Sequence, residues 1–377
     1  MSKRRRQTVG ALMVAATLAL SGCALVTRAG VALLYENAVL PAAQIVRDAC
    51  YIAAPCNTAD HTLDLYLPTQ REWPVIVFVH GGGWDSGDKN YRAGSADVYA
   101  NIGRYYATRG IGVAVINYRL QPRVQWSEQV DDVRAAVSWV RNNIAARGGR
   151  PDRMFLMGHS AGTHLAAMVA LETTGAAPAA RGVIAVSGAA LDLADEATYR
   201  LGADRRYYEQ RFRGSDAGVA WQRRASPISR VSAAAPPFLI MYATGESRAL
   251  QHQSRLLHEA LLAAGARSEL VPVPGESHTR IVLALSHPRK VPAQAIVEFV
   301  ERSAAKPIQS LQHTVGGIDS VAALAASGGR SARRRRPPAT RVSMPGTVVH
   351  RVCPGIKTSS TLKFAEGSAM PGPMVVV

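Results

Sequence analysis

Apolar residues recur along the middle of the chain in two alternating patterns. Residues 63–67 alternate with a period of two, and residues 75–79, Val-Ile-Val-Phe-Val, are apolar at every position. An uninterrupted apolar run of this length predicts a strand buried on both faces of a sheet. Between residues 127 and 146 the apolar residues fall at helical spacing, with acidic residues at the start and arginines at the end, as the helix dipole favours. The two patterns together predict alternating strands and helices.

The alternation continues to about residue 303. Further strands are expected at 112–118, 153–156, 183–186, 238–242 and 269–273, and further helices at 163–171, 250–263 and 293–302. Strands that alternate with helices and are buried on both faces indicate an α/β fold with a mostly parallel, doubly wound sheet. Residues 189–236 interrupt the rhythm and are rich in Arg, Tyr and Asp, so we expect a small cap insertion there.

The net charge of +17 is concentrated at the two ends of the chain. Residues 1–23 carry four basic and no acidic groups, and residues 306–377 carry ten basic and two acidic groups. Residues 24–305 hold 30 basic and 25 acidic residues, the balance of an ordinary globular domain. Because aromatic residues are few and no nucleic-acid-binding motif is present, nucleic acid is not an expected partner. The tail, residues 306–377, has no periodicity and is expected to be disordered.

Residues 1–22 have the features of an export signal. Basic residues 3–6 precede an apolar stretch, residues 9–20, that is too short for a transmembrane helix of about 20 residues. Leu-Ser-Gly-Cys at residues 20–23 resembles a bacterial lipobox, which implies lipidation of Cys23 and a mature N-terminus there. Ala24 in the next position implies the outer membrane. The expected location is therefore the periplasmic face of that membrane. An ordinary signal peptide followed by a buried cysteine remains the alternative.

Export bears on the other cysteines and on the domain boundaries. In an oxidising compartment Cys50 and Cys56 are expected to form a disulfide, with two free thiols as the alternative. Residues 23–54 are expected to be a linker or cap region, and residues 55–303 the catalytic domain.

One turn between a strand and a helix carries the strongest chemical signal. Gly158-His159-Ser160-Ala161-Gly162 follows the apolar run at 153–156 and precedes the Ala- and Leu-rich stretch at 163–171. A G-x-S-x-G sequence in this context places the serine on a sharp, strained turn with its hydroxyl exposed. The glycines are needed because strand and helix approach too closely there for side chains. Ser160 is therefore the expected nucleophile.

A serine hydroxyl needs a base, and the base needs an acid that orients it. On this kind of turn the chain order is Ser, then Asp or Glu, then His. His278 lies in a loop just after the last expected strand and is the expected base. Glu246, in the loop after the strand at 238–242, is the expected acid. Asp192 remains the alternative acid because it follows the strand at 183–186.

Donors for the developing oxyanion are expected in a second glycine-rich turn. His80-Gly81-Gly82-Gly83-Trp84 directly follows the strand at 75–79. Glycines let backbone N–H groups approach an oxyanion without interference from Cβ atoms. Gly82, Gly83 and Ala161 are the expected donors, and His80 is expected to brace the loop through hydrogen bonds. The sequence has no metal-ligand or phosphate-binding motif, so no metal and no cofactor are expected.

Together these motifs resemble the α/β-hydrolase carboxylesterases with an H-G-G-x-W motif, in the branch that includes feruloyl-esterase-like, isoprenylcysteine-methylesterase-like and kynurenine-formamidase-like proteins. The resemblance covers about residues 55–303 and also rests on Asn117–Leu120, Asp152-Arg153 and the Gly275–His278 loop. It implies an α/β-hydrolase fold that hydrolyses carboxylic esters, or an N-formyl amide, through a Ser-His-acid triad. Glu246 departs from this branch, in which the acid is usually Asp.

The expected function is a serine carboxylesterase that acts on a small-molecule ester through an acyl-enzyme. An amide hydrolase for formylated aromatic amines is the alternative among enzymes, and the oligomeric state is left open. The alternative of another class is a catalytically silent envelope lipoprotein that uses the fold to bind a partner. A binding module does not need a nucleophile, a base and oxyanion glycines together, which favours the enzyme.

Overall fold

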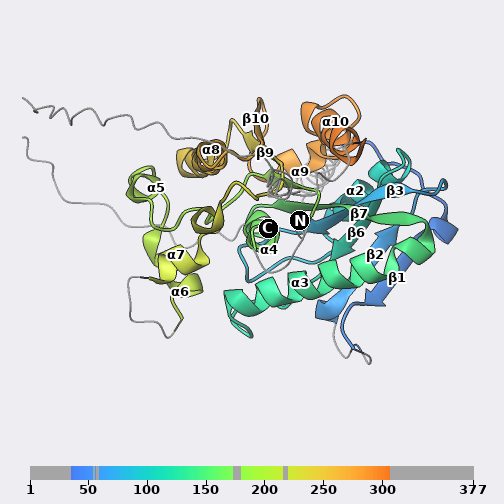
Figure 1. Cartoon of the computed structure of the whole chain (residues 1–377), viewed down its shortest axis with the longest axis horizontal. Helices are drawn as coiled ribbons and strands as arrows, with labels where there is room; N and C mark the ends of the chain where they lie inside the picture. The colour runs from blue at the N-terminus through green and yellow to red at the C-terminus, as the bar shows by residue number, and fades with distance from the viewer. Residues whose placement is uncertain (1–34, 54–55, 57–58, 173–179, 215–219, 306–377) are drawn as a thin grey trace, which may run out of the picture. The chain divides into compact units, whose positions relative to one another are not determined.

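The structure, a computed structural model, describes residues 35–53, 56, 59–172, 180–214 and 220–305 (Figure 1). The expected export signal, Cys23 and the tail at 306–377 lie outside the described residues. In the described part, no helix is both long and apolar enough to cross a membrane.

Within the described residues, eight strands form one sheet in the order β1-β2-β6-β3-β7-β8-β9-β10. The strands from β6 to β10 in this order run parallel, whereas β2 is antiparallel to both of its neighbours, β1 and β6. A short β4–β5 pair lies apart from this sheet. The strands are β1 Ile45–Cys50, β2 Thr62–Tyr66, β3 Trp73–Val79, β4 Arg92–Ala93, β5 Ala96–Asp97, β6 Gly112–Ile116, β7 Gly149–His159, β8 Gly182–Val186, β9 Phe238–Ala243 and β10 Ser268–Val273.

Helices cover both faces of the sheet, so the fold is doubly wound as expected. The α-helices are α2 Val98–Ala107, α3 Trp126–Asn143, α4 Ala161–Ala170, α5 Glu196–Arg200, α6 Arg205–Phe212, α7 Trp221–Ala225, α8 Arg248–Ala263, α9 Ile281–Ala284 and α10 Val291–Ala305. Short 3-10 turns are η1 Ala42–Gln44, η2 Ala59–His61, η3 Ala145–Arg147 and η4 Pro227–Arg230. Apolar residues of α3, α4 and α8 belong to one core cluster, and those of α2, α9 and α10 to a second.

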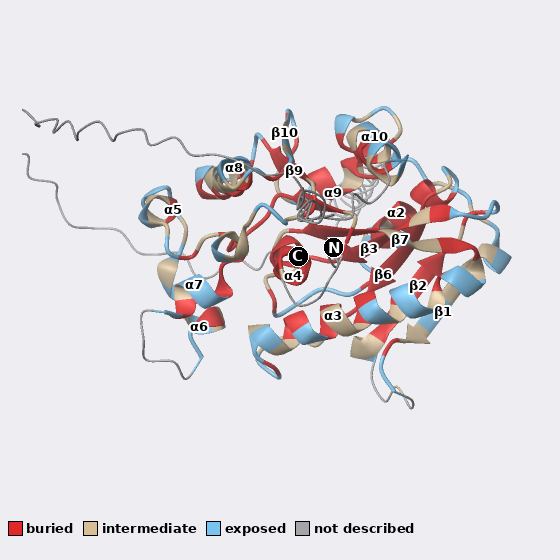
Figure 2. Cartoon of the chain, viewed as in Figure 1, coloured by how far each residue is buried: buried red, intermediate tan, exposed pale blue. Residues whose placement is uncertain are grey.

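The central strands separate these two clusters, which explains their continuous apolar sequences (Figure 2). In β3, Val75, Val77 and Val79 belong to the first cluster, whereas Ile76 and Phe78 belong to the second. Side chains of a strand alternate between the two faces, so every position of such a strand must be apolar.

The sheet begins before the expected boundary at residue 55. Strand β1 lies inside the segment expected to be a linker or cap, residues 23–54, and pairs antiparallel with β2. A disulfide joins Cys50 at the end of β1 to Cys56, with their Cα atoms 5.7 Å apart. The register of β1 shifts between Val46 and Ala49, and no residue of this edge strand is fully buried. The regular apolar pattern on which the sequence prediction depended is therefore absent from β1.

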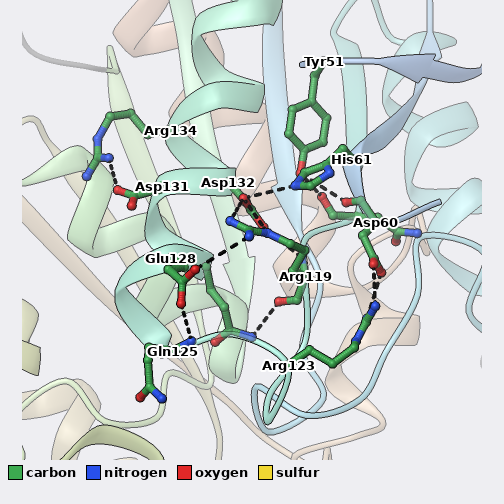
Figure 3. Close-up of polar contacts among 12 residues, drawn as sticks. Tyr51, Asp60, His61, Arg119, Arg123, Gln125, Glu128, Asp131, Asp132 and Arg134 are labelled. Atoms are coloured by element: carbon green, nitrogen blue, oxygen red, sulfur yellow. Dashed lines mark hydrogen bonds and ion pairs between the residues drawn. The ribbon is translucent and has the colours of Figure 1, made fainter. Parts of the chain in front are cut away.

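A polar cluster ties the start of α3 to the loop after β6 (Figure 3). Asp132 of α3 accepts hydrogen bonds from the backbone N–H of Arg119 at 3.0 Å and from its guanidinium at 2.8 Å. Asp132 also lies 3.3 Å from Nε2 of His61, in η2. These contacts fix the loop that packs behind the glycine-rich turn.

The expected cap segment folds into short helices between β8 and β9. It contains α5, α6, α7 and η4, and α6 and α7 contact each other beside the carboxyl edge of the sheet (Figure 1). The aromatic residues Tyr208, Phe212 and Trp221 of this segment are buried in the same cluster as Trp84 of the glycine-rich turn. The segment is therefore packed onto the body through apolar contacts.

Candidate active site

Ser160 lies on a strained turn between β7 and α4. It has φ 54° and ψ −121°, which is unfavourable for a residue with a side chain. A Cβ atom on Gly158 would lie 2.3 Å from the carbonyl oxygen of Gly162, and one on Gly162 would lie 2.1 Å from that of Val79. Glycine is therefore required at both positions, and the turn has the geometry of a nucleophile elbow.

The structure brings three sequence-predicted residues together in one chain of hydrogen bonds. His278, in the loop after β10, has Nε2 2.9 Å from Oγ of Ser160. Its Nδ1 lies 2.9 Å from Oε2 of Glu246, in the loop after β9. The carboxylate of Glu246 only accepts, so Nδ1 carries the hydrogen and Nε2 is left as the acceptor for the serine hydroxyl. This tautomer is the one that general-base catalysis needs.

Burial of Glu246 strengthens its hydrogen bond to His278. The side chain of Glu246 is 0% exposed, whereas that of His278 is 29% exposed. A hydrogen bond between an ionised carboxylate and an N–H is stronger away from water. The acid is thus buried, whereas the base remains partly accessible to solvent.

The alternative acid, Asp192, has different partners in the structure. Its carboxylate accepts from the backbone N–H of Ala194 at 2.9 Å, and its own backbone exchanges hydrogen bonds with the amide of Gln253. Burial raises the pKa of Asp192. No contact between Asp192 and His278 occurs in the described part of the chain, so the geometry favours Glu246.

Each carbonyl group of the glycine-rich turn is held by a hydrogen bond. The carbonyl oxygens of four consecutive residues accept hydrogen bonds. That of Gly81 accepts from Nδ1 of His80 at 2.7 Å, and that of Gly82 accepts from N and Oγ of Ser86 at 2.9 and 2.7 Å. That of Gly83 accepts from Nε of Arg211 at 2.9 Å, and that of Trp84 from Nε2 of Gln129 at 2.7 Å. In a trans peptide the N–H points opposite to the C=O. The N–H groups of Gly82 and Gly83 therefore point away from these donors, and they have no acceptor among the described residues.

The same turn lies against the nucleophile. A Cβ atom on Gly81 would lie 3.2 Å from Cβ of Ser160. Ala161, whose N–H is the third expected donor, is the first residue of α4, where the helix dipole adds partial positive charge. The glycine-rich turn, through Gly81, and the first residue of α4 thus both adjoin Ser160, and the donor role expected of Gly82, Gly83 and Ala161 stays a prediction.

His80 braces this turn from behind. Its ring is buried and stacks on Tyr118, with centroids 4.4 Å apart. Burial lowers the pKa of His80, so the ring is neutral and its Nδ1–H donates to the Gly81 carbonyl. The bracing role expected from the sequence agrees with this contact.

Two residues of the cap, which the sequence did not indicate as part of the site, contact the glycine-rich turn. Arg211 of α6 donates to the Gly83 carbonyl, pairs with Asp85 and stacks over the ring of Tyr207 at 3.6 Å. The hydroxyl of Tyr207 also lies 3.4 Å from the Gly83 carbonyl. The only sequence signal for this contact was the general richness of the cap in Arg and Tyr.

A buried histidine links the turn to the cap from the other side. Nε1 of Trp84 donates to Nδ1 of His164 at 3.3 Å, and Nε2 of His164 donates to the carbonyl of Ala225 at 2.7 Å. Burial lowers the pKa of His164 to about 4, which keeps the ring neutral and able to accept from Trp84. The position of the cap and that of the glycine-rich turn are therefore linked.

The described residues contain no group of three or more His, Cys, Asp or Glu side chains arranged to hold a metal ion.

Comparison with known proteins follows this geometry. The BD-FAE family matches residues 63–261, which is more than half of the chain. The chain belongs to the BD-FAE family. The match runs from β2 to α8 and includes the glycine-rich turn, the nucleophile elbow and Glu246, while His278 follows it.

Curated relatives of this BD-FAE protein carry esterase names. A probable isoprenylcysteine α-carbonyl methylesterase, ICMEL1 of Oryza sativa subsp. japonica, is 31% identical over 263 residues, covering 64% of this chain and 58% of the relative. Esterase LipQ of Mycobacterium tuberculosis is 31% identical over 255 residues, covering 64% and 59%. The chain thus spans less than two thirds of the length of these relatives.

The crystal structure of esterase B from Lactobacillus rhamnosis is similar with a TM-score of 0.59 at 22% identity, covering 77% of this chain and 95% of that one. This likeness concerns the fold alone. Together with the mostly parallel sheet, it shows that this BD-FAE member has the α/β-hydrolase fold.

Proposed function

We propose that this protein is a serine carboxylesterase that hydrolyses small carboxylic esters through an acyl-enzyme on Ser160. The observation that carries the proposal is the hydrogen-bonded series from Ser160 through His278 to Glu246 on a nucleophile elbow. The esterase names of the relatives support the same class of reaction.

The geometry suggests how each step would proceed. Oγ of Ser160 attacks the ester carbonyl carbon while Nε2 of His278 accepts its proton, and the carboxylate of Glu246 stabilises the resulting imidazolium. The N–H groups of Gly82, Gly83 and Ala161 hold the oxyanion, and each such donor contributes roughly 3–4 kcal/mol to the transition state. His278 then gives the proton to the leaving alcohol. In the second half His278 activates a water that releases the acid and restores Ser160.

Hydrolysis of p-nitrophenyl acetate and labelling by a fluorophosphonate test this proposal. The wild-type protein should do both, and Ser160→Ala should lose labelling completely and turnover by roughly 10⁵-fold or more. Activity retained in Ser160→Ala would overturn the assignment of the nucleophile. A panel of acyl esters, a feruloyl ester and N-formylkynurenine identifies the substrate class, and turnover of the formamide alone would favour the amide hydrolase.

We also propose that the protein is exported and lipid-anchored at Cys23. The support is the lipobox-like sequence at 20–23 together with the Cys50–Cys56 disulfide, a bond typical of oxidising compartments. Cys23→Ser should abolish incorporation of labelled palmitate in a bacterial host and release the protein from the membrane fraction. Unchanged fractionation of this variant would count against the anchor.

A further inference from the structure

His159, the residue before the nucleophile, makes contacts that the mechanism above does not use. The residue is buried, with 6% exposure, and its Nε2 lies 2.8 Å from the backbone carbonyl oxygen of His278. A carbonyl oxygen can only accept, so Nε2 carries the hydrogen. Burial and the neighbouring His278 lower the pKa of His159 to about 3, so the ring is neutral. One neutral histidine thus donates to the backbone of the other.

The same ring also touches the glycine-rich turn. A Cβ atom on Gly81 would lie 2.9 Å from Nδ1 of His159, so the ring packs directly against that backbone. His159 precedes Ser160 in the chain, and its ring centroid lies 5.0 Å from that of His278. Three separate parts of the site therefore meet at this one side chain. They are the nucleophile elbow, the glycine-rich turn and the loop after β10 that carries His278, here called the base loop.

The base loop needs such a contact because the bonds of the His278 ring do not by themselves fix the backbone of the loop. Between β10 and α9 the chain turns through Gly275 with φ 75°, and the carbonyl of Glu276 accepts from the backbone N–H of Gly245 at 3.0 Å. That bond holds the loop to the acid loop, and Glu246 orients the ring. The buried carboxylate of Glu276 also pairs with Lys290 at 3.0 Å. None of these contacts is made with the nucleophile elbow, whereas the bond from His159 is, because His159 is adjacent to Ser160.

We infer that His159 is a positioning residue that holds the backbone of His278 at the distance from Ser160 that proton transfer requires. The inference rests on the proposed function. A displacement of about 1 Å in a reacting group costs roughly 100-fold in rate, so a loss of this bond should be visible in turnover. The effect should fall on kcat and leave KM within about twofold, since His159 lies behind the reacting groups.

The leaving group provides a readout that a purely structural role would not affect. His278 must protonate a poor leaving alcohol, whereas p-nitrophenolate departs without a proton. We expect His159→Leu to lower kcat/KM, which reports acylation, roughly 10-fold for p-nitrophenyl acetate and roughly 100-fold for an alkyl ester such as ethyl acetate. A variant that was merely less folded would lose the same factor on both esters. Rates are therefore expressed per fluorophosphonate-titrated site.

Two further variants complete the test. His159→Gln places an amide N–H near the position of Nε2, so it should recover most of the lost turnover on both esters. His258→Leu removes another partly buried histidine, which lies on α8 and bonds Oγ of Ser268 at the start of β10, and should leave both rates unchanged. Equal loss on the two esters, or no recovery in His159→Gln, would overturn the positioning role. An inactive wild-type protein would instead contradict the proposed function.

Discussion

Among the described residues, two histidine–carboxylate pairs have a buried carboxylate, unlike His252–Asp195, and only one of the two has the surroundings of a catalytic pair. His278 and Glu246 are 2.9 Å apart at the nucleophile elbow, and His61 and Asp132 are 3.3 Å apart beside the start of α3 (Figure 3). Both carboxylates are buried, with side chains 0% and 6% exposed. Burial and a histidine partner therefore do not distinguish the two pairs.

The difference lies in what else each group contacts. Asp132 also accepts hydrogen bonds from the guanidinium and the backbone N–H of Arg119, so its negative charge is neutralised by an ion pair. The ring of His61 packs edge-on against Tyr51. Glu246, in contrast, has an Oε1 with no partner among the described residues, and the second nitrogen of its histidine meets a serine hydroxyl. A catalytic pair is thus recognised by the nucleophile it reaches, and a structural pair by the cation that neutralises it.

Removal of the acid should have the largest effect in this comparison. Glu246→Ala leaves His278 without an orienting partner, and turnover should fall roughly 10³- to 10⁴-fold, as for loss of the acid in other triads. Asp192→Ala should change turnover less than about threefold, because Asp192 makes no described contact with His278. Ester hydrolysis per titrated site measures both. A larger loss in Asp192→Ala would transfer the role of the acid to Asp192.

The structural pair should respond in stability and not in turnover. Asp132→Ala leaves the partly exposed Arg119 and His61 without their carboxylate, and we expect a loss of about 1–3 kcal/mol in the free energy of unfolding. Asp131→Ala on the same helix is the matched control, because Asp131 is 61% exposed and its ion pair with Arg134 should contribute less than about 1 kcal/mol. Chemical denaturation measures the stability. A loss of turnover per titrated site in Asp132→Ala, at unchanged stability, would contradict the distinction.

Much of the fold could be predicted because the central strands are buried on both faces and stand out as apolar runs. Helix α2 did not give such a signal. Nearly all of its residues are buried, including the polar Asn101, so burial in this helix does not follow an apolar run in the sequence. The cap helices α5 and α7 are too short to show a pattern. Strand β1 lies at the sheet edge with a register shift, which removes the period of two.

The active site also has parts that the sequence could predict and parts that it could not. The elbow and the glycine-rich turn are local features, because close backbone approach demands glycines at fixed spacing, so the sequence could indicate them. The contact from Arg211 to the Gly83 carbonyl spans 128 residues, and no local pattern predicts it. The role inferred for His159 likewise depends on which backbone its ring meets. Contacts between distant segments are thus what the sequence alone could not supply.

His164 is a buried histidine without a carboxylate partner, and its titration should have the smallest effect on stability. Burial lowers the pKa of His164 to about 4 from an unfolded value of 6.5. Below pH 6.5 the unfolded chain therefore binds a proton that the folded chain excludes, and stability falls as the pH falls towards 4. Between pH 7 and pH 5 this one group should cost about 2 kcal/mol. Well above pH 6.5 both states are neutral, and this penalty is absent.

Substitution of His164 isolates this contribution. His164→Gln retains an amide between Trp84 and the Ala225 carbonyl but removes the titrating group. The variant should be less stable than the wild type at pH 7, yet lose about 2 kcal/mol less between pH 7 and pH 5, as measured by urea denaturation at each pH. Parallel stability curves for the two proteins would mean that His164 takes up its proton at the same pH in the folded and the unfolded state, and so is protonated at pH 5 in the folded state. In that case Trp84 Nε1–H would face a second donor, and the link from the glycine-rich turn to the cap through His164 would not exist.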